Sequence, residues 1–208
     1  MAFFFLLRVG EYTRPHDRVV TRTVQFRVCD VRFWQGQTLL SPHSDPATLA
    51  AASSVTLTVD NQKNGQRGDT VHQEASGSDF CPVRSIAALV SAIMAQDMPL
   101  TTLLRYVQQG IHVQPPMILL AIRRGGARLA NLEASRYDLT RVGAQHLLLA
   151  SGGAVALWLS GHSPEASMKM GRWHTQMFLT YIHSQIATLT TGTSQKMGCS
   201  VNFHNVSG

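Results

Sequence analysis

The segment 54–73 constrains the fold most strongly, because its alternation and its turn chemistry are both those of a β-hairpin. Apolar and polar residues alternate from Val55 to Val59, as they do in a strand that buries one face. Asn64-Gly65 follows, which is a strong hairpin-turn signal, and a second alternating run comes after it. The sequence therefore predicts a pair of antiparallel strands.

A helix is predicted directly after this hairpin. Cys81-Pro82 opens a segment in which apolar residues recur with the helical period, and proline is well suited to the first helical position. The apolar run 2–7 is too short to span a bilayer, and we expect it to form a buried helix. Because the chain begins inside that element, we expect it to be a fragment or to have lost an upstream domain. Further helices are expected over 100–109, 115–130 and 143–158.

Arginines alternate with apolar residues between positions 14 and 32, a pattern typical of a strand with a phase slip near Asp30. The arginines are Arg14, Arg18, Arg22, Arg27 and Arg32. Such a strand could follow a phosphate backbone, and a solvated strand face accounts for the charges equally well. Residues 35–53 are rich in Ser, Pro and Gly, and they predict a loop that ends in a short helical turn.

The composition favours a globular protein with an anionic partner. The chain has 208 residues, of which 44% are apolar and 14% are charged, which suffices for one domain with a sizeable core. The net charge of +6 indicates nucleic acid first and an acidic membrane surface second. The three cysteines form no Cys-x-x-Cys pair, which argues against a zinc site or a disulfide scaffold and favours a reducing intracellular compartment.

One tyrosine near the C-terminal end stands in a helical pattern. Met177, Phe178, Tyr181 and Ile182 recur at helical spacing, so Tyr181 is expected on or beside an apolar helix face. Packing in a core accounts for such an aromatic residue by itself. Phrases elsewhere in the chain give this tyrosine a second interpretation.

Four phrases, in their order along the chain, resemble the tyrosine recombinase (phage-integrase-like) family, in the form carried by eukaryotic mobile elements of the Crypton or DIRS-like type. They are Arg8-Val-Gly-Glu11, Gln62-Lys63-Asn64-Gly65, Cys81-Pro82-Val83 and the segment from Gly171 to His183. The resemblance implies an α+β fold that is mainly α-helical, with a small antiparallel sheet. It also implies a catalytic domain over 1–190, a flexible tail over 191–208 and an absent upstream DNA-clamping domain.

The chemistry that this resemblance implies is DNA breaking and rejoining through a 3′-phosphotyrosyl intermediate, without a metal or cofactor. Tyr181 would be the nucleophile, Arg8 would clamp the phosphate and Lys63 would act as the general acid. Trp173 would hydrogen-bond a non-bridging oxygen, in place of the family's usual histidine. The implied partner is double-stranded DNA, bound by a homotetramer in the nucleus for integration of a mobile element, with no membrane involved. Further DNA contacts are predicted for Arg172, Arg14 and Arg27.

The family's second arginine is the position where this chain departs from the pattern. Family members carry a His-x-x-Arg box at the start of a helix, followed by small residues. Aligning the stretch from Gly152 to Leu157 with those small residues puts Ala150 at the arginine position and Leu147 at the histidine position. The other register supplies Arg141, but it needs an insertion. We prefer Ala150, which predicts an impaired enzyme, and keep Arg141 as the alternative second arginine.

Two other interpretations of the whole chain stay open. It could be a catalytically inactive relic that keeps a basic DNA-binding surface, or a helical protein-interaction domain unrelated to DNA. Salt-dependent binding of DNA separates the protein-interaction domain from the recombinase and the relic, because phosphate contacts release counterions. Gly161-His162-Ser163 resembles a phrase of bacterial family members, but it lies too far from Tyr181 to supply their histidine. The histidines of this region lack metal-ligand spacing, so we expect no metal.

Overall fold

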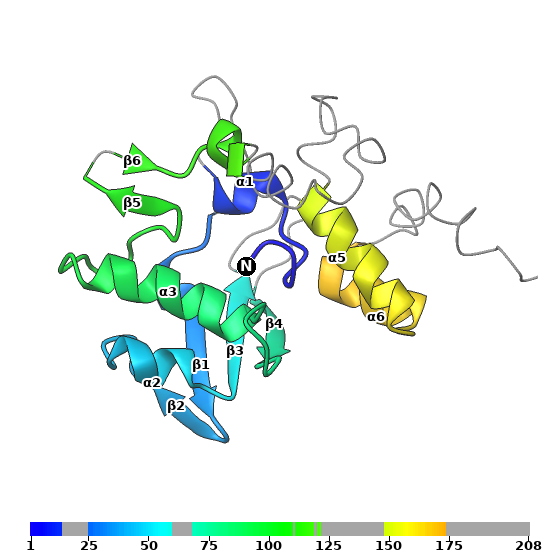
Figure 1. Cartoon of the computed structure of the whole chain (residues 1–208), viewed down its shortest axis with the longest axis horizontal. Coiled ribbons are helices and arrows are strands. Elements are labelled where there is room, and N and C mark those ends of the chain that lie inside the picture. The colour runs from blue at the N-terminus through cyan, green and yellow to red at the C-terminus, as the bar shows by residue number, and fades with distance from the viewer. Residues whose placement is uncertain (14–24, 60–67, 110, 119, 122–147, 174–208) are drawn as a thin grey trace, which may run out of the picture. The chain divides into compact units, whose positions relative to one another are not determined.

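The computed structural model describes residues 1–13, 25–59, 68–109, 111–118, 120–121 and 148–173 (Figure 1). The chain divides into two compact units, residues 1–153 and 154–208, which we describe one at a time. The described residues contain both helices and a small antiparallel sheet, which confirms the predicted α+β class. The predicted domain boundary at residue 190 lies outside the described residues.

The first unit is built on a four-stranded antiparallel sheet in the order β2-β1-β3-β4. Its strands are β1 (Val31–Gln35), β2 (Thr38–Leu40), β3 (Ser54–Val59) and β4 (Asp69–Glu74). Strands β3 and β4 pair in the register Leu57↔Val71, so the hairpin predicted over 54–73 is confirmed. Residues 60–67 between them, with Lys63, lie outside the described residues.

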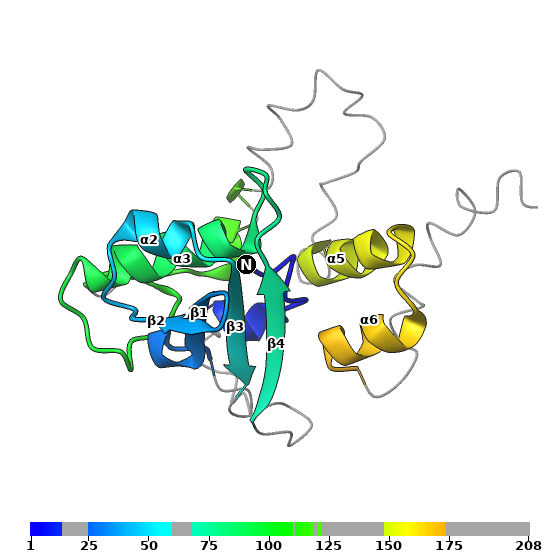
Figure 2. The ribbon, with the colours of Figure 1, turned by 90° about the horizontal axis from the view of Figure 1, so that it is seen from below.

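Apolar residues alternate along the strands, so one face of the sheet is apolar, and helices cover that face. Val55, Leu57 and Val59 are buried on that face, together with residues of α3 (Pro82–Met94). Helix α2 (Pro46–Ala50) lies beside α3, as the two views show (Figures 1 and 2). The apolar stripe of α3 follows the helical period that its sequence predicted, and its buried members are Val83, Ile86, Ala87, Val90 and Ile93.

Both of these helices begin with proline after a capping position. Pro82 stands at the start of α3, as predicted, where a missing N–H costs nothing. In α2 the N-cap is Asp45, whose carboxylate accepts the Thr48 N–H at 2.9 Å. The short helical turn expected at the end of the 35–53 loop is therefore α2. The same loop also contains β2, which the sequence prediction missed.

The connection between β1 and β2 explains this missed strand. Only Gly36 and Gln37 separate the two strands, and Gly36 has a φ of +60°, which a tight hairpin turn demands and glycine supplies without strain. The Gly36 N–H donates to the hydroxyl of Ser53, the residue before β3, at 2.8 Å, which holds the turn in place. A single glycine was too weak a signal to predict this turn.

The expected buried helix over 2–7 is wrong in its secondary structure, although the segment is buried. Residues 2–6 form turns, with a backbone hydrogen bond from the Leu7 N–H to the Ala2 carbonyl at 3.0 Å. Leu6 has a φ of +48°, and a left-handed residue cannot continue an α-helix. The helix near this end is α1 (Val9–Tyr12) instead.

The helix expected over 100–109 is also wrong, because this segment pairs with distant backbone. The Leu104 N–H donates to the Phe26 carbonyl at 2.8 Å, and the Val28 N–H donates to the Thr102 carbonyl at 2.9 Å. The segment then continues as β5 (Tyr106–Gln108), which pairs with β6 (Ile111–His112). Tertiary hydrogen bonds thus override the local helical pattern here. Of the helix expected over 115–130, helical residues are described at 115–118 and 120–121.

The phase slip predicted near Asp30 is a single turn of 3-10 helix. This turn, η1 (Val28–Asp30), separates an extended segment from β1. Phe26 before the turn, Val28 at its first residue, and Val31 and Phe33 after it are all buried. The turn shifts the buried phase by one residue, which is why strict alternation fails at this place.

Helix α5 (Leu148–Leu159) crosses the division between the units and confirms the helix predicted over 143–158 from residue 148 onward. In the second unit it ends in a Schellman motif: Gly161, with a φ of +83°, is followed by His162, whose N–H donates to the Leu157 carbonyl at 3.1 Å. Ser163 then caps α6 (Pro164–Gly171) by accepting the Ala166 N–H at 3.2 Å. Helix capping therefore accounts for Gly161-His162-Ser163.

Candidate functional site

The predicted site residues fall into two groups. Arg8, Arg27, Ala150, Arg172 and Trp173 belong to the described residues. The others, Arg14, Lys63, Arg141 and Tyr181, lie outside them. Of the first group, Arg8 has the surroundings that bear most directly on phosphate binding.

Arg8 stands immediately before α1, and Glu11 fixes its backbone. The Glu11 carboxylate accepts the Arg8 N–H through Oε2 at 2.7 Å, and the Glu11 N–H donates to the Arg8 carbonyl at 2.8 Å. Glu11 is only 2% exposed, so this charge-assisted bond is shielded from water. The pair forms the acidic half of a capping box, with the glutamate three residues after the cap. The spacing Arg8-Val-Gly-Glu11 is therefore a local structural device as well as a family phrase.

The Arg8 guanidinium contrasts with this well-bonded backbone. Its Nη1 atom is removed from solvent and has no hydrogen-bond partner in the part of the chain that the structure describes. A buried donor left in this way costs about 1–3 kcal/mol, and more when the group is charged. An anionic oxygen placed against Nη1 would remove this cost. The local geometry thus favours an anion at Arg8.

Tyr12, next to this pair, is a structural residue. It is buried, and burial raises its pKa to about 12, with the Glu11 charge adding to the effect. A phenol with so high a pKa stays protonated near neutral pH and is a poor nucleophile. The Gln25 side-chain amide also donates to the Thr13 carbonyl at 2.8 Å, which ties the end of α1 to the segment before η1.

Arg27, predicted to contact DNA, is engaged by its own turn. Its Nη2 atom lies 3.0 Å from Asp30 Oδ1, its Nε donates to Oδ2 at 3.2 Å, and its backbone N–H donates to the same oxygen at 2.8 Å. Asp30 is buried, so these bonds are shielded from solvent and stabilise η1. The DNA contact of Arg27 stays a prediction, and its local role is to hold the turn before β1.

In the second unit, Trp173 lies against the end of α6. The Trp173 N–H donates to the Met168 carbonyl at 2.9 Å, and the Arg172 N–H donates to the Lys169 carbonyl at 3.2 Å, which is again a Schellman motif. A Cβ built on Gly171 would come within 2.5 Å of the Trp173 ring, so the indole occupies space that only glycine leaves open. The phrase Gly171-Arg172-Trp173 thus sets the position of the tryptophan through packing.

Arg172 occupies the left-handed position of this motif, where glycine is the usual residue. Its φ is +54°, and its side chain is only 4% exposed. A left-handed residue with a long side chain costs of order 1–2 kcal/mol, and such strain is often found at functional sites. A residue that contacts DNA from the surface is exposed, whereas Arg172 is buried. The DNA contact predicted for Arg172 therefore gains no support from its burial and stays a prediction.

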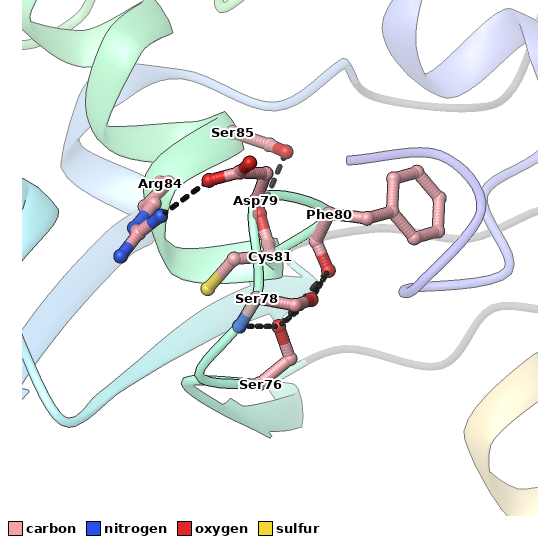
Figure 3. A network of polar contacts seen from close by, with 7 residues as sticks. All are labelled: Ser76, Ser78, Asp79, Phe80, Cys81, Arg84 and Ser85. Atoms are coloured by element: carbon pink, nitrogen blue, oxygen red, sulfur yellow. Dashed lines mark hydrogen bonds and ion pairs between the residues drawn. The ribbon is translucent and has the colours of Figure 1, made fainter.

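The loop before α3 contains a polar network that the sequence did not predict (Figure 3). The Ser76 and Ser78 hydroxyls both donate to the Phe80 carbonyl, at 2.9 and 3.1 Å. Cys81 follows at the N-cap and is 2% exposed. Burial raises the pKa of its thiol, but N–H groups at the start of α3 and the Ser76 hydroxyl outweigh that effect and leave the pKa below its usual value. The thiol is buried and is therefore shielded from solvent.

Comparisons with protein-family models, curated proteins and solved structures give no match. Within the described ranges, no helix is long and apolar enough to cross a membrane. The same residues include no group of three or more histidine, cysteine or acidic side chains that could hold a metal ion.

Proposed function

We propose that this chain is the catalytic domain of a tyrosine recombinase of the eukaryotic mobile-element type, which binds duplex DNA. Tyr181 attacks the scissile phosphate, giving a 3′-phosphotyrosyl link and a free 5′-hydroxyl. Arg8 binds the phosphate, Lys63 protonates the leaving oxygen and Trp173 hydrogen-bonds a non-bridging oxygen. The domain acts in the nucleus as a homotetramer on DNA. Among the described residues, the surroundings of Arg8 give this proposal its strongest support.

The observation that carries the proposal is the shielded Arg8 Nη1 atom, which has no partner in the described part of the chain. Glu11 holds the backbone at this position, so the arginine begins from a fixed point rather than from a mobile loop. Phosphate oxygens are strong acceptors for guanidinium N–H groups, and the chain's net charge of +6 favours a polyanion. DNA phosphate matches both observations.

A second candidate function, a DNA-binding relic that cannot cleave, is favoured by the preferred sequence register. Aligning the stretch from Gly152 to Leu157 with the family's small residues puts an alanine, Ala150, at the second arginine position. Loss of one preorganised donor to the transition-state oxygens typically slows such reactions about 10²–10³-fold. The relic would keep the phosphate contacts and lose strand cleavage.

Duplex binding is tested by titration at several salt concentrations. We expect affinity to fall as salt rises, because Lys and Arg contacts release counterions from DNA. Arg8→Gln should lower the affinity and reduce the salt slope by about one phosphate contact. Arg84→Gln is the matched control, because Arg84 is exposed and pairs with Asp79 at 3.2 Å. Affinity that does not depend on salt would contradict a nucleic-acid role.

Cleavage is tested by trapping a covalent adduct on a nicked suicide substrate, with a DNA-clamping domain from an intact relative supplied. The relic gives no adduct until Ala150→Arg and Leu147→His rebuild the box, and Tyr181→Phe then abolishes it. Robust adduct from the unmodified chain, lost on Arg141→Ala, would show that Arg141 is the second arginine. Adduct that survives Tyr181→Phe would contradict the proposed nucleophile.

A further inference from the structure

The second face of the sheet, opposite α2 and α3, carries a hollow that the proposed function does not use. The hollow has a volume of about 680 Å³ and opens widely to solvent. Its lining includes Trp34 from β1, Thr56 from β3, and His72 and Glu74 from β4. These residues alternate with the buried ones, so they share the outward face. The sheet register alone brings them together.

Two rows of side chains cross this face. In the first row Arg32 pairs with Thr56, which pairs with His72; in the second row Trp34 pairs with Ser54, which pairs with Glu74. Side chains paired directly across antiparallel strands lie about 4.5–5.5 Å apart at Cβ, and the two rows are about 7 Å apart along the strands. One ligand of moderate size would therefore touch both rows.

A hydrogen bond restrains the Trp34 indole in an orientation that allows stacking. Its Nε1–H donates to the Thr56 hydroxyl at 3.1 Å, and the same hydroxyl lies 3.0 Å from His72 Nδ1. The indole N–H is therefore engaged, and a ligand meets the ring through its π face. Trp34 is half-buried, so the ring is restrained and still accessible. A restrained aromatic ring loses little conformational entropy when a flat ligand stacks on it.

The surrounding groups indicate what would stack there. Arg32 is exposed, and no side-chain hydrogen bond or ion pair engages it within the described residues. Glu74 is exposed at the opposite side of the hollow and can accept hydrogen bonds from ring or amino N–H groups. A ring with N–H groups at one edge and a phosphate at the other complements an aromatic platform, a carboxylate and a guanidinium. A nucleotide has this chemistry, and a basic chain favours one within a polyanionic strand.

We infer that the hollow at Trp34 binds an unpaired nucleotide of a single-stranded nucleic acid, with the base stacked on Trp34, an edge of the base bonded to Glu74 and the adjacent phosphate near Arg32. This site is separate from the proposed cleavage site and uses neither Arg8 nor Trp173. It adds single-strand binding to the proposed binding of duplex DNA.

The binding test uses two probes of equal charge, a twelve-residue oligodeoxythymidylate and an abasic oligonucleotide of the same length. Trp158→Phe and Trp173→Phe together leave Trp34 as the only one of the three tryptophans. In this variant the thymidylate should quench the tryptophan fluorescence and bind about tenfold or more tightly than the abasic probe, because stacking needs a base. Equal affinity for the two probes, or thymidylate binding without quenching, would overturn the inference.

Substitutions at the hollow separate stacking from charge. Trp34→Leu keeps apolar volume without a π face and should remove the preference for the thymidylate, whereas Trp34→Phe should keep most of it. Arg32→Gln should weaken binding of both probes and lower the salt slope by about 0.7, and Arg84→Gln on the other side of the sheet should leave both unchanged. Unchanged preference in Trp34→Leu would contradict the proposed stacking.

Duplex DNA, titrated in parallel, keeps this inference distinct from the proposed function. Thymidylate binding through Trp34 with no duplex binding supports the hollow and contradicts the recombinase proposal. Duplex binding that depends on Arg8, with no preference for thymidylate over the abasic probe, supports the recombinase proposal and overturns the hollow. Neither result can be taken for the other.

Discussion

Gly171→Ala tests how the chain positions Trp173. The new Cβ would lie 2.5 Å from Cε3 and 2.6 Å from Cδ2 of the indole, which is far inside van der Waals contact, so the ring has to move. Alanine in a helix is about 1 kcal/mol more favourable than glycine, and forced overpacking costs about 1–3 kcal/mol. We therefore expect a net loss of stability of up to about 2 kcal/mol, together with a displaced indole.

Gly161→Ala is the matched control, because the same substitution there acts through the opposite cause. No atom lies within 4 Å of a Cβ at Gly161, but its φ of +83° is unfavourable for alanine. The expected loss is about 1–2 kcal/mol from backbone strain alone, with Trp173 undisturbed. The two glycines thus separate a packing effect from a conformational one.

The assay is urea unfolding followed by tryptophan emission, in a Trp34→Phe/Trp158→Phe background where only Trp173 emits. Gly171→Ala should shift the native emission, and Gly161→Ala should lower the unfolding midpoint without that shift. If Gly171→Ala were more stable than the parent and kept its native emission, the indole would not lie against Gly171. In that case the packing argument for Trp173 would be refuted.

Three further predictions concern stability. Glu11→Ala should lower the free energy of unfolding in urea by about 1–3 kcal/mol, because it removes a shielded hydrogen bond to the Arg8 N–H. The control is Glu165→Ala, at an exposed position in the first turn of α6, which should cost only a few tenths of a kcal/mol. Equal losses in the two variants would contradict the capping role of Glu11. Tyr12 has a pKa of about 12 in the folded protein against 10 for a free tyrosine, so folding favours its neutral form. The resulting contribution to the free energy of unfolding is complete below pH 10 and is lost as pH rises toward 12. Tyr12→Phe should therefore flatten the decline of stability over this range, measured by unfolding at several pH values. Asp45→Ala should cost about 1 kcal/mol by removing the cap of α2, measured by the same urea unfolding, and an unchanged midpoint would show that the cap is dispensable.

Local geometry accounts for part of the candidate site, although Arg8 and Glu11 were singled out by the family resemblance. Arg8 and Glu11 are three residues apart, so one helical turn brings the carboxylate to the backbone N–H without help from the rest of the fold. The hollow at Trp34 could not be found in this way. Trp34 and Thr56 are 22 residues apart in sequence, and their hydrogen bond depends on how β1 and β3 are paired. Polar residues on a strand indicate an outward face, but they do not tell which strand lies beside it.

The sequence by itself determined the β3–β4 hairpin, helix α3 and the start of that helix at Pro82, because each depends on residues close together along the chain. Only the tertiary structure decided the segment around Leu104, which has a helical pattern but donates its N–H to the Phe26 carbonyl. It also decided residues 2–6, where the left-handed Leu6 turns a buried apolar run away from the helical path. In both cases, hydrogen bonding and burial against distant residues outweigh a local preference of a few tenths of a kcal/mol per residue.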